Sequence, residues 1–168
     1  MPKFPKHGRS RVLIFNLSPQ VDGGRYPVKR LVNECLEVQV GLVADGHDVL
    51  NGQLAYRAVD AKKWQYQNLE ALGNDQFQAS LCPSQAGNYE YKIEAWVDYA
   101  LTWQYGLQKK HEDGQDVSVH MQDGLAHFKH LQKQKVGVAN AIIKHLKSQP
   151  QEALKLALSQ DLTDAFKK

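Results

Sequence analysis

The chain has 168 residues, an apolar content of 42% and a formal net charge of +3 from 21 basic and 18 acidic side chains, which excludes wholesale disorder and fits one domain or two small ones. Its basic residues are not gathered into one stripe, so the composition gives no reason to expect nucleic acid as a partner. No apolar run approaches the roughly 18 residues of a membrane helix, and the N-terminus lacks the apolar middle of a signal peptide, so we expect a cytoplasmic protein with no membrane partner.

Short segments of alternating apolar and polar residues follow a basic stretch at 1–10, which we expect to be a flexible tail. Gly, Asn and Asp separate these segments, and they are typical turn residues. In the clearest segment the apolar face is formed by Leu36, Val38, Val40 and Leu42. We expect strands at 11–17, 35–42, 53–59, 64–69, 76–81 and 89–97, with a turn at Leu72-Gly73-Asn74-Asp75. The pattern predicts an antiparallel β-sandwich over residues 11–98.

The apolar period changes to that of a helix after residue 98. Ala100, Trp103 and Leu107 follow the i, i+3, i+7 spacing of one helix face. Further apolar stripes follow at 125–131, 138–146 and 154–162, and between the last two Ser148 is a candidate helix cap. We therefore expect three to five short helices in a small bundle over residues 99–168, which places the whole chain in the α+β class.

Cys35 and Cys82 are isolated cysteines, each within an apolar, strand-like run. Disulfides are rare in the cytoplasm, and free cysteine is among the residue types most often buried. We therefore expect two buried free thiols rather than a disulfide.

A structural tyrosine is expected where the strand at 89–97 begins. The run Gly87-Asn88-Tyr89-Glu90-Tyr91 resembles the start of the sixth strand of immunoglobulin-like domains. In those domains a tyrosine hydroxyl bonds back to the backbone, so Tyr89 or Tyr91 is interpreted as structural rather than catalytic.

Histidines and paired carboxylates are the residues that suggest chemistry most directly. His120, His127 and His130 lie close together in sequence, but no Cys, Asp or Glu stands beside them at a zinc-ligand spacing, so we expect exposed polar residues and no metal site. Carboxylates lie close in sequence at 45 and 48, 112 and 113, and 161 and 164, where turns and helix ends are expected. Gly23-Gly24 lacks the pattern of a phosphate loop. We expect no catalytic residue and no cofactor.

The tryptophans leave two interpretations open. Trp64 and Tyr66 share one face of an alternating segment, which suits either a sugar-stacking platform or core packing, and we favour the core. Trp96 is either exposed or buried against helix residues such as Trp103, and we favour burial.

A series of short motifs then gives a family resemblance. The motifs are Ser18-Pro19, Asp22-Gly23-Gly24-Arg25-Tyr26-Pro27-Val28-Lys29-Arg30, Ala44-Asp45-Gly46-His47-Asp48-Val49, Leu72-Gly73-Asn74-Asp75, Gly87-Asn88-Tyr89-Glu90-Tyr91 and Glu94-Ala95-Trp96-Val97-Asp98. In order and spacing they resemble the N-terminal domain of bacterial α-1,4-glucan:maltose-1-phosphate maltosyltransferases, of the α-amylase clan in glycoside hydrolase family 13. We treat as structural signature residues Asp22, Gly23, Gly24, Arg25, Pro27, Gly46, His47, Asp48, Tyr89, Trp96 and Asp98.

The resemblance implies an immunoglobulin-like sandwich with an inserted helical segment, both of which help to build a homodimer. In that family a (β/α)₈ barrel follows and holds the carboxylates for retaining transfer of maltosyl from maltose 1-phosphate to an α-glucan. A barrel needs at least about 200 residues. We therefore expect a truncated helical insertion and a non-catalytic scaffold and dimerisation region, whose partners are a second copy and the barrel of the same polypeptide. The alternative is an α-glucan-binding module that uses Trp64 and Tyr66.

Overall fold

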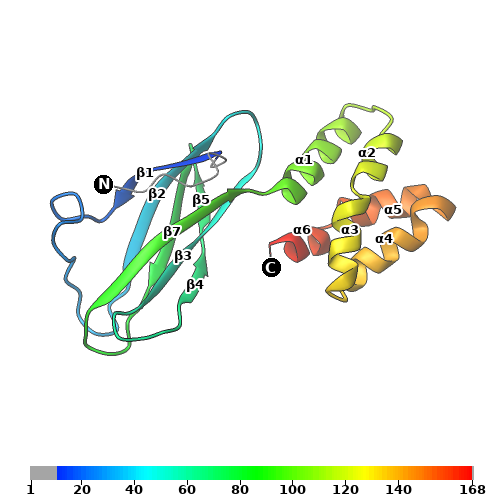
Figure 1. The fold of residues 1–168 in the computed structure, drawn as a ribbon. Helices are drawn as coiled ribbons and strands as arrows, with labels where there is room; N and C mark the ends of the chain where they lie inside the picture. The colour runs from blue at the N-terminus through cyan, green and yellow to red at the C-terminus, as the bar shows by residue number, and fades with distance from the viewer. Residues whose placement is uncertain (1–10, 168) are drawn as a thin grey trace. The chain divides into compact units, whose positions relative to one another are not determined.

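The computed structural model describes residues 11–167 and divides into two compact units, one ending at Val97 and the other beginning at Asp98. The expected tail at 1–10 lies outside the described residues. The first unit is built from strands and the second from helices (Figure 1). The strands are β1 (Val12–Ser18), β2 (Leu36–Ala44), β3 (Leu50–Ala58), β4 (Gln65–Asn68), β5 (Glu70–Gly73), β6 (Gln76–Leu81) and β7 (Tyr89–Val97).

Two antiparallel sheets form the first unit, with strand orders β1-β2-β6-β5 and β4-β3-β7. The apolar face of β2 is buried as its alternation predicts: Val38, Val40 and Leu42 have no exposed surface, while Glu37 and Gln39 are exposed. These side chains pack with Leu54 and with residues of β6 and β7 in one core. Burying a Val or Leu side chain contributes about 1.5–3 kcal/mol, so this core stabilises the sandwich. The predicted α+β class, an immunoglobulin-like sandwich followed by helices, is confirmed.

One short strand was not expected, and it includes the first half of the turn predicted at 72–75. Residues Glu70–Gly73 form β5 and pair with β6, so the turn between them shrinks to Asn74-Asp75. Both turn residues have positive φ, 49° and 59°, the conformation that two-residue hairpins of the primed type require. Asn and Asp tolerate this conformation, and therefore the strand continues closer to the turn than the sequence pattern indicated.

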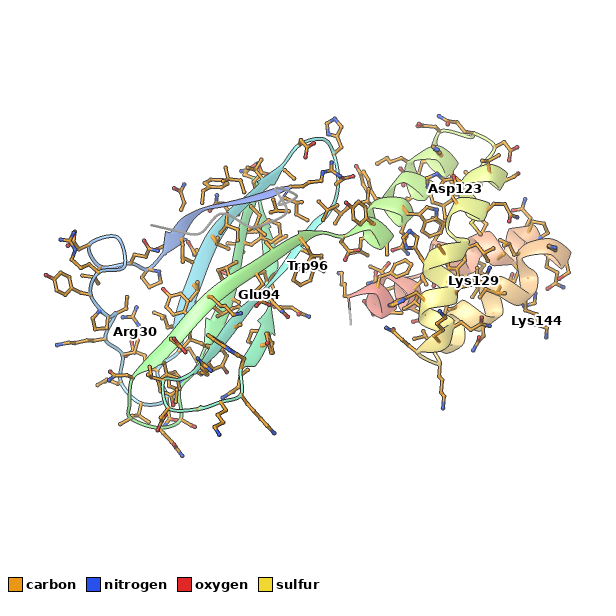
Figure 2. The ribbon with its side chains drawn as sticks, in the orientation of Figure 1. Arg30, Glu94, Trp96, Asp123, Lys129 and Lys144 are labelled. Carbon is orange, nitrogen blue, oxygen red and sulfur yellow. A yellow bond between two sulfur atoms is a disulfide. The ribbon has the colours of Figure 1, made fainter. Side chains whose placement is uncertain are left out.

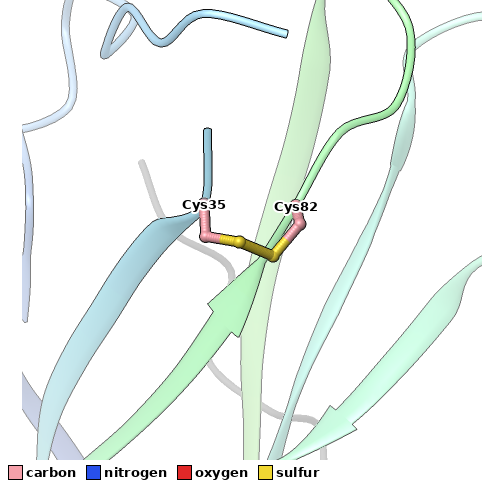
Figure 3. The surroundings of a disulfide bond; sticks show 2 residues. All are labelled: Cys35 and Cys82. Atoms are coloured by element: carbon pink, nitrogen blue, oxygen red, sulfur yellow. A yellow bond between two sulfur atoms is a disulfide. The ribbon is translucent and has the colours of Figure 1, made fainter. Parts of the chain in front are cut away.

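The prediction of two buried free thiols is wrong, because Cys35 and Cys82 form a disulfide (Figure 3). Leu36 of β2 pairs with Leu81 of β6. Cys35 directly precedes Leu36 and Cys82 directly follows Leu81, so the two cysteines lie opposite each other, with Cα atoms 4.1 Å apart. Both cysteines are exposed. The two residues are separated by 47 positions, and only the strand register brings them together.

The second unit contains six helices within residues 98–167, more than the three to five expected. They are α1 (Tyr99–Glu112), α2 (Ser118–Asp123), α3 (Leu125–Lys133), α4 (Gly137–Ser148), α5 (Pro150–Ala157) and α6 (Gln160–Phe166). The apolar stripe at 154–162 is divided because the side chain of Ser159 caps α6. Ser148 does not cap α5: Gln149 is the N-cap, and the Ser148 hydroxyl donates to the carbonyl of Lys144.

Trp103 and Phe128 lie at the centre of the helical core, with ring centroids 5.2 Å apart in an edge-to-face arrangement. A buried amide beside them ties α1 to the C-terminal helices. Gln104 Nε2 donates to the carbonyl of Ala157 at 3.0 Å, and its Oε1 accepts from Thr163 Oγ1 at 3.0 Å. Because these polar groups are satisfied, the burial of Gln104 is not costly.

A search of residues 11–167 finds no helix with the length and apolar character needed to cross a membrane.

Candidate functional site

The sandwich unit contains a hollow of about 630 Å³, which we call the loop hollow. Its walls come from the loop between β1 and β2 and from the connection between β6 and β7. Most of the segment from Pro19 to Arg30, which gave the strongest sequence motif, lies in the first wall, and Figure 2 labels Arg30 there. The start of β7 completes the lining with Tyr89 and Tyr91.

The first wall contains a small hairpin-like turn. Val21 and Tyr26 form an isolated β-bridge, and the amide of Tyr26 donates to the carbonyl of Val21 at 3.3 Å. Asp22, Gly23 and Gly24 all have positive φ, between 50° and 86°, and glycine adopts this conformation without steric cost. This backbone geometry explains why two glycines stand together in the motif.

Asp22 and Arg25 form an ion pair across this turn, with Arg25 Nη1 and Asp22 Oδ2 3.2 Å apart. Both side chains are largely exposed, so the pair contributes little to stability. It neutralises the charge of each group where the loop meets solvent.

Three connections hold the two walls of the loop hollow together at their base. Tyr91 Oη donates to the carbonyl of Pro19 at 3.0 Å, and the amide of Asn33 donates to the carbonyl of Pro83 at 2.9 Å. The Cys35–Cys82 disulfide is the third. Burial raises the pKa of the Tyr91 hydroxyl, which keeps it protonated as a donor. The segments that form the two walls are therefore linked to each other at three points.

Tyr89 and Tyr91 both serve the backbone. Tyr89 Oη donates to the carbonyl of Gln85, four residues upstream, at 3.3 Å. This hydrogen bond has the form of a tyrosine corner, while Tyr91 reaches across to the other wall. Both hydroxyl groups have structural partners, which agrees with a structural rather than a catalytic interpretation.

The interior of the loop hollow combines open aromatic and apolar surface with uncharged polar groups. Tyr26 is 58% exposed and Leu31 is 78% exposed. The amide side chains that line the hollow are Gln20, Gln85 and Asn88. Sequence reasoning gave none of these amides a binding role, because nothing in the local pattern indicates that residues 20 and 85–88 face each other.

The second group of signature residues lies elsewhere. Gly46, His47 and Asp48 belong to the connection between β2 and β3, and Gly46 has a φ of 89°. Arg11 holds this connection through Asp45, at 3.2 Å, and Asp48, at 3.2 Å. The hydrogen bond from Arg11 lowers the pKa of Asp45, which favours the ionised form of this carboxylate. A smaller hollow of about 300 Å³ beside them shares no lining residue with the loop hollow.

The expectation that Trp64 and Tyr66 pack in the core is wrong. Leu69 is the buried residue of this segment, and Tyr66, which lies on the opposite face, is 53% exposed. The ring of Trp64 is covered instead by two cations: Arg57 Cζ lies 4.4 Å and Lys92 Nζ 4.8 Å from the ring centroid. Glu90 and Glu94 fix these cations with ion pairs of 2.6 and 2.5 Å.

Trp96 belongs to the same outer face of β7 and is labelled with Glu94 in Figure 2. It is 40% exposed, so the prediction of burial is wrong. Trp103, the helix residue expected to cover it, has its ring in contact with side chains of its own unit.

Two of the three histidines considered above, His120 and His127, are less exposed than expected. The ring of His120 stacks on Trp103 with centroids 5.7 Å apart, and its Nε2 lies 3.0 Å from the Trp103 carbonyl oxygen. His127 is half-buried, and this burial lowers its pKa, while His130 is exposed as expected. In the part of the chain that the structure describes, no group of three or more His, Cys, Asp and Glu side chains could hold a metal ion.

The family described as alpha-1,4-glucan:maltose-1-phosphate maltosyltransferase, domain N/S, has a model that matches residues 10–168. This chain belongs to that family. The match covers both units of the fold and includes every signature residue named from the sequence.

Curated maltosyltransferases share clear sequence identity with this N/S domain. The alpha-1,4-glucan:maltose-1-phosphate maltosyltransferase of Chlorobaculum tepidum is 39% identical over 120 residues, which is 71% of this chain and 18% of the relative. That of Methylacidiphilum infernorum is 35% identical over 121 residues, 72% of this chain and 18% of the relative. That of Picrophilus torridus is 32% identical over 133 residues, 79% of this chain and 21% of the relative. The matched region spans about a fifth of the length of these relatives.

The signature residue Asp98 is a helix cap, a role that was not predicted from the sequence. Asp98 directly precedes α1, and its Oδ1 accepts a hydrogen bond from the amide of Leu101 at 2.9 Å. Aspartate just before a helix is a preferred N-cap, so its position was the available signal. The signature residues thus lie in four places. Those at 22–27, with Tyr89, belong to the loop hollow and the turn beside it, and those at 46–48 belong to the β2–β3 connection that Arg11 holds. Trp96 lies on the outer face of β7, and Asp98 caps α1.

Proposed function

We propose that this N/S domain is a non-catalytic scaffold and self-association region of a maltosyltransferase that extends α-1,4-glucan from maltose 1-phosphate. The observation that carries the proposal is the free edge of β7. This strand pairs with β3 along all nine of its residues, and among the strands of residues 11–167 it has no partner on its other side. A long, regular edge strand is a template for pairing with another strand.

The neighbourhood of β7 supports this role. Helix α1 begins directly after β7, with Asp98 as the cap between them, so the helical unit follows the edge strand without a linker. The opposite edge of the same sheet is β4, which has only four residues. Short edge strands protect a sheet from pairing, whereas the length of β7 favours it. The proposed partner is a second copy or the remainder of the same polypeptide.

The mass of the chain at increasing concentration tests self-association. Light scattering is expected to show a dimer or larger species, and backbone amides of β7 are expected to exchange more slowly with solvent when it forms. Amides of β4 provide the internal control, because their exchange is expected to stay unchanged. A monomer at every concentration, with β7 amides that exchange as fast as those of β4, would contradict the proposed self-association.

A turnover assay tests the non-catalytic part of the proposal. The chain is expected to release no phosphate from maltose 1-phosphate in the presence of glycogen. The proposal assigns the acid/base and nucleophile chemistry to another part of the enzyme. Measurable turnover by the purified chain would overturn this assignment.

A second candidate function is α-glucan binding, and the exposure of Tyr66 is the observation in its favour. Trp64, the partner expected for Tyr66, is a poor platform because Arg57 and Lys92 lie over its ring. A sugar that stacked there would have to displace cations that Glu90 and Glu94 hold in place. The outer face of β4-β3-β7 is therefore a poor location for such a site.

The cytoplasmic location expected from the sequence stays a proposal. The Cys35–Cys82 disulfide is of a kind more common in oxidising compartments. The proposed location is tested by counting free thiols in protein taken directly from cells, with the thiols trapped before lysis. Two free thiols per chain are expected if the protein resides in a reducing cytoplasm.

A further inference from the structure

We propose that the loop hollow is a binding site for an α-1,4-glucan chain, in which the ring of Tyr26 stacks on a glucose unit and the amides of Gln85 and Asn88 bind its hydroxyl groups. The proposal rests on the proposed function for the choice of ligand. The location is new, because it moves glucan binding away from Trp64 and Tyr66.

The size of the loop hollow and the links between its walls suit a small ligand. Its volume of about 630 Å³ lies within the range of roughly 300–1,000 Å³ that is typical of ligand sites. Hydrogen bonds from Tyr91 to Pro19 and from Asn33 to Pro83 join the segments that form the two walls, independently of the disulfide. A preformed site binds more tightly than one that must first be ordered, because less conformational entropy is lost.

The surface chemistry of the hollow matches a sugar. A glucose ring has a face of C–H groups that packs on an aromatic ring and an edge of hydroxyl groups that both donate and accept hydrogen bonds. Tyr26, 58% exposed in the hollow, supplies an open aromatic surface. Gln20, Gln85 and Asn88 line the same hollow, and each amide offers both a donor and an acceptor.

The charges of the walls favour an uncharged ligand. Arg25 is paired with Asp22 at 3.2 Å, and Glu90 is paired with Arg57 at 2.6 Å. Arg25, Arg30 and Glu90 are the charged residues of the lining. Arg30 Nε lies 3.9 Å from Glu34 Oε1, so each of these three side chains has an oppositely charged neighbour. A phosphate or an acidic peptide would gain little electrostatic attraction from such walls, whereas the binding of a neutral polyhydroxyl chain does not depend on such attraction.

Tyr26 and Tyr66 provide a matched pair of variants. Both are tyrosines of the same unit with similar exposure, 58% and 53%, but Tyr26 lines the hollow and Tyr66 lies on the outer face of β4. The chain is titrated with maltoheptaose by calorimetry, and amide NMR shifts locate the contact. Tyr26→Ala is expected to weaken binding at least tenfold, and Tyr66→Ala is expected to leave it unchanged. The shifts are expected at Gly24, Gly87 and Asn88.

Asn88→Ala gives a second test that does not depend on the loop turn. The backbone carbonyl of Asn88, which accepts from the amide of Val59, is retained in this variant. It is also expected to weaken maltoheptaose binding, with an unchanged circular dichroism spectrum. Cellohexaose, which has β-1,4 links, serves as the ligand control and is expected to bind more weakly.

Several results would overturn the proposal. They are no binding of maltoheptaose at millimolar concentration, equal binding of cellohexaose, or loss of binding in Tyr66→Ala with Tyr26→Ala unaffected. None of them bears on self-association, which is measured by light scattering without glucan. The failure of the glucan site and the failure of the scaffold role are therefore distinguishable.

Discussion

The disulfide gives the sharpest quantitative prediction for the sandwich unit. The double variant Cys35→Ala/Cys82→Ala removes the covalent link. It keeps the adjacent pairing of β2 with β6, in which the buried Leu36 and Leu81 lie opposite each other. Both cysteines are exposed, so truncation leaves no cavity. The change therefore acts mainly on the unfolded chain, which gains freedom when a closed loop is opened.

The size of the effect follows from the loop length. The cysteines are 47 positions apart, and a loop of that length corresponds to about 4 kcal/mol of lost chain entropy in the unfolded state. We expect the free energy of unfolding of the sandwich to fall by about this amount. Since whole domains are stable by only about 5–15 kcal/mol, the loss is a large fraction of the total.

Native-state hydrogen exchange measures this free energy for the sandwich alone. The amides of Val38 and Val40 lie in β2, between β1 and β6, and are expected to exchange only through unfolding of this unit. Reductant should lower their protection in the original chain to the level of the double variant and should not affect the variant itself. A change below roughly 1 kcal/mol, or two free thiols in the oxidised protein, would refute the reasoning.

Three further predictions concern the helical unit, each measured by urea unfolding followed by circular dichroism. Because burial lowers the pKa of His127 below its ordinary value of 6.5, the unfolded chain takes up the proton more readily. Stability is therefore expected to decrease as the pH falls through about 6.5, and His127→Gln is expected to flatten this dependence; a steep slope in the variant would contradict it. Asp98→Ala removes the N-cap of α1 and is expected to cost about 1 kcal/mol, whereas an unchanged midpoint would argue against capping. In Gly124→Ala the new methyl group overlaps the ring of Trp103 and is expected to cost about 1–3 kcal/mol, whereas Gly137→Ala, which enters open space, is expected to be neutral or slightly stabilising; equal effects would disprove the packing argument.

The elements with a clear apolar period could be predicted from the sequence. The alternation in β2 fixed which side chains face the core, and the spacing of Trp103 and Leu107 marked the buried face of α1. The separation into a strand-rich and a helix-rich part follows from the same local signal. The short elements β5 and α2 were missed: half of β5 was assigned to a turn because of its glycine, and the six residues of α2 contain fewer than two helical turns.

The candidate site was predicted only in part. The segment Asp22-Gly23-Gly24-Arg25 was recognised as a tight turn, and its positive φ values explain the glycines. The opposite wall of the loop hollow comes from residues about 60 positions away along the chain, and local patterns contain no information on which loops face each other. The aromatic face was misjudged for the same reason: alternation places Trp64 and Tyr66 together, but only the register with β3 decides which side is the core.

The sequence by itself determined the strand and helix periods, the turns and the family to which this chain belongs, because each of these is encoded in short runs of residues. The tertiary structure alone decided the disulfide, the exposure of Trp96 and Tyr66, and the hollow beside the signature turn. All three depend on strand register, which brings residues far apart in the chain into contact. A shift of one residue in that register would move every side chain to the other face of the sheet.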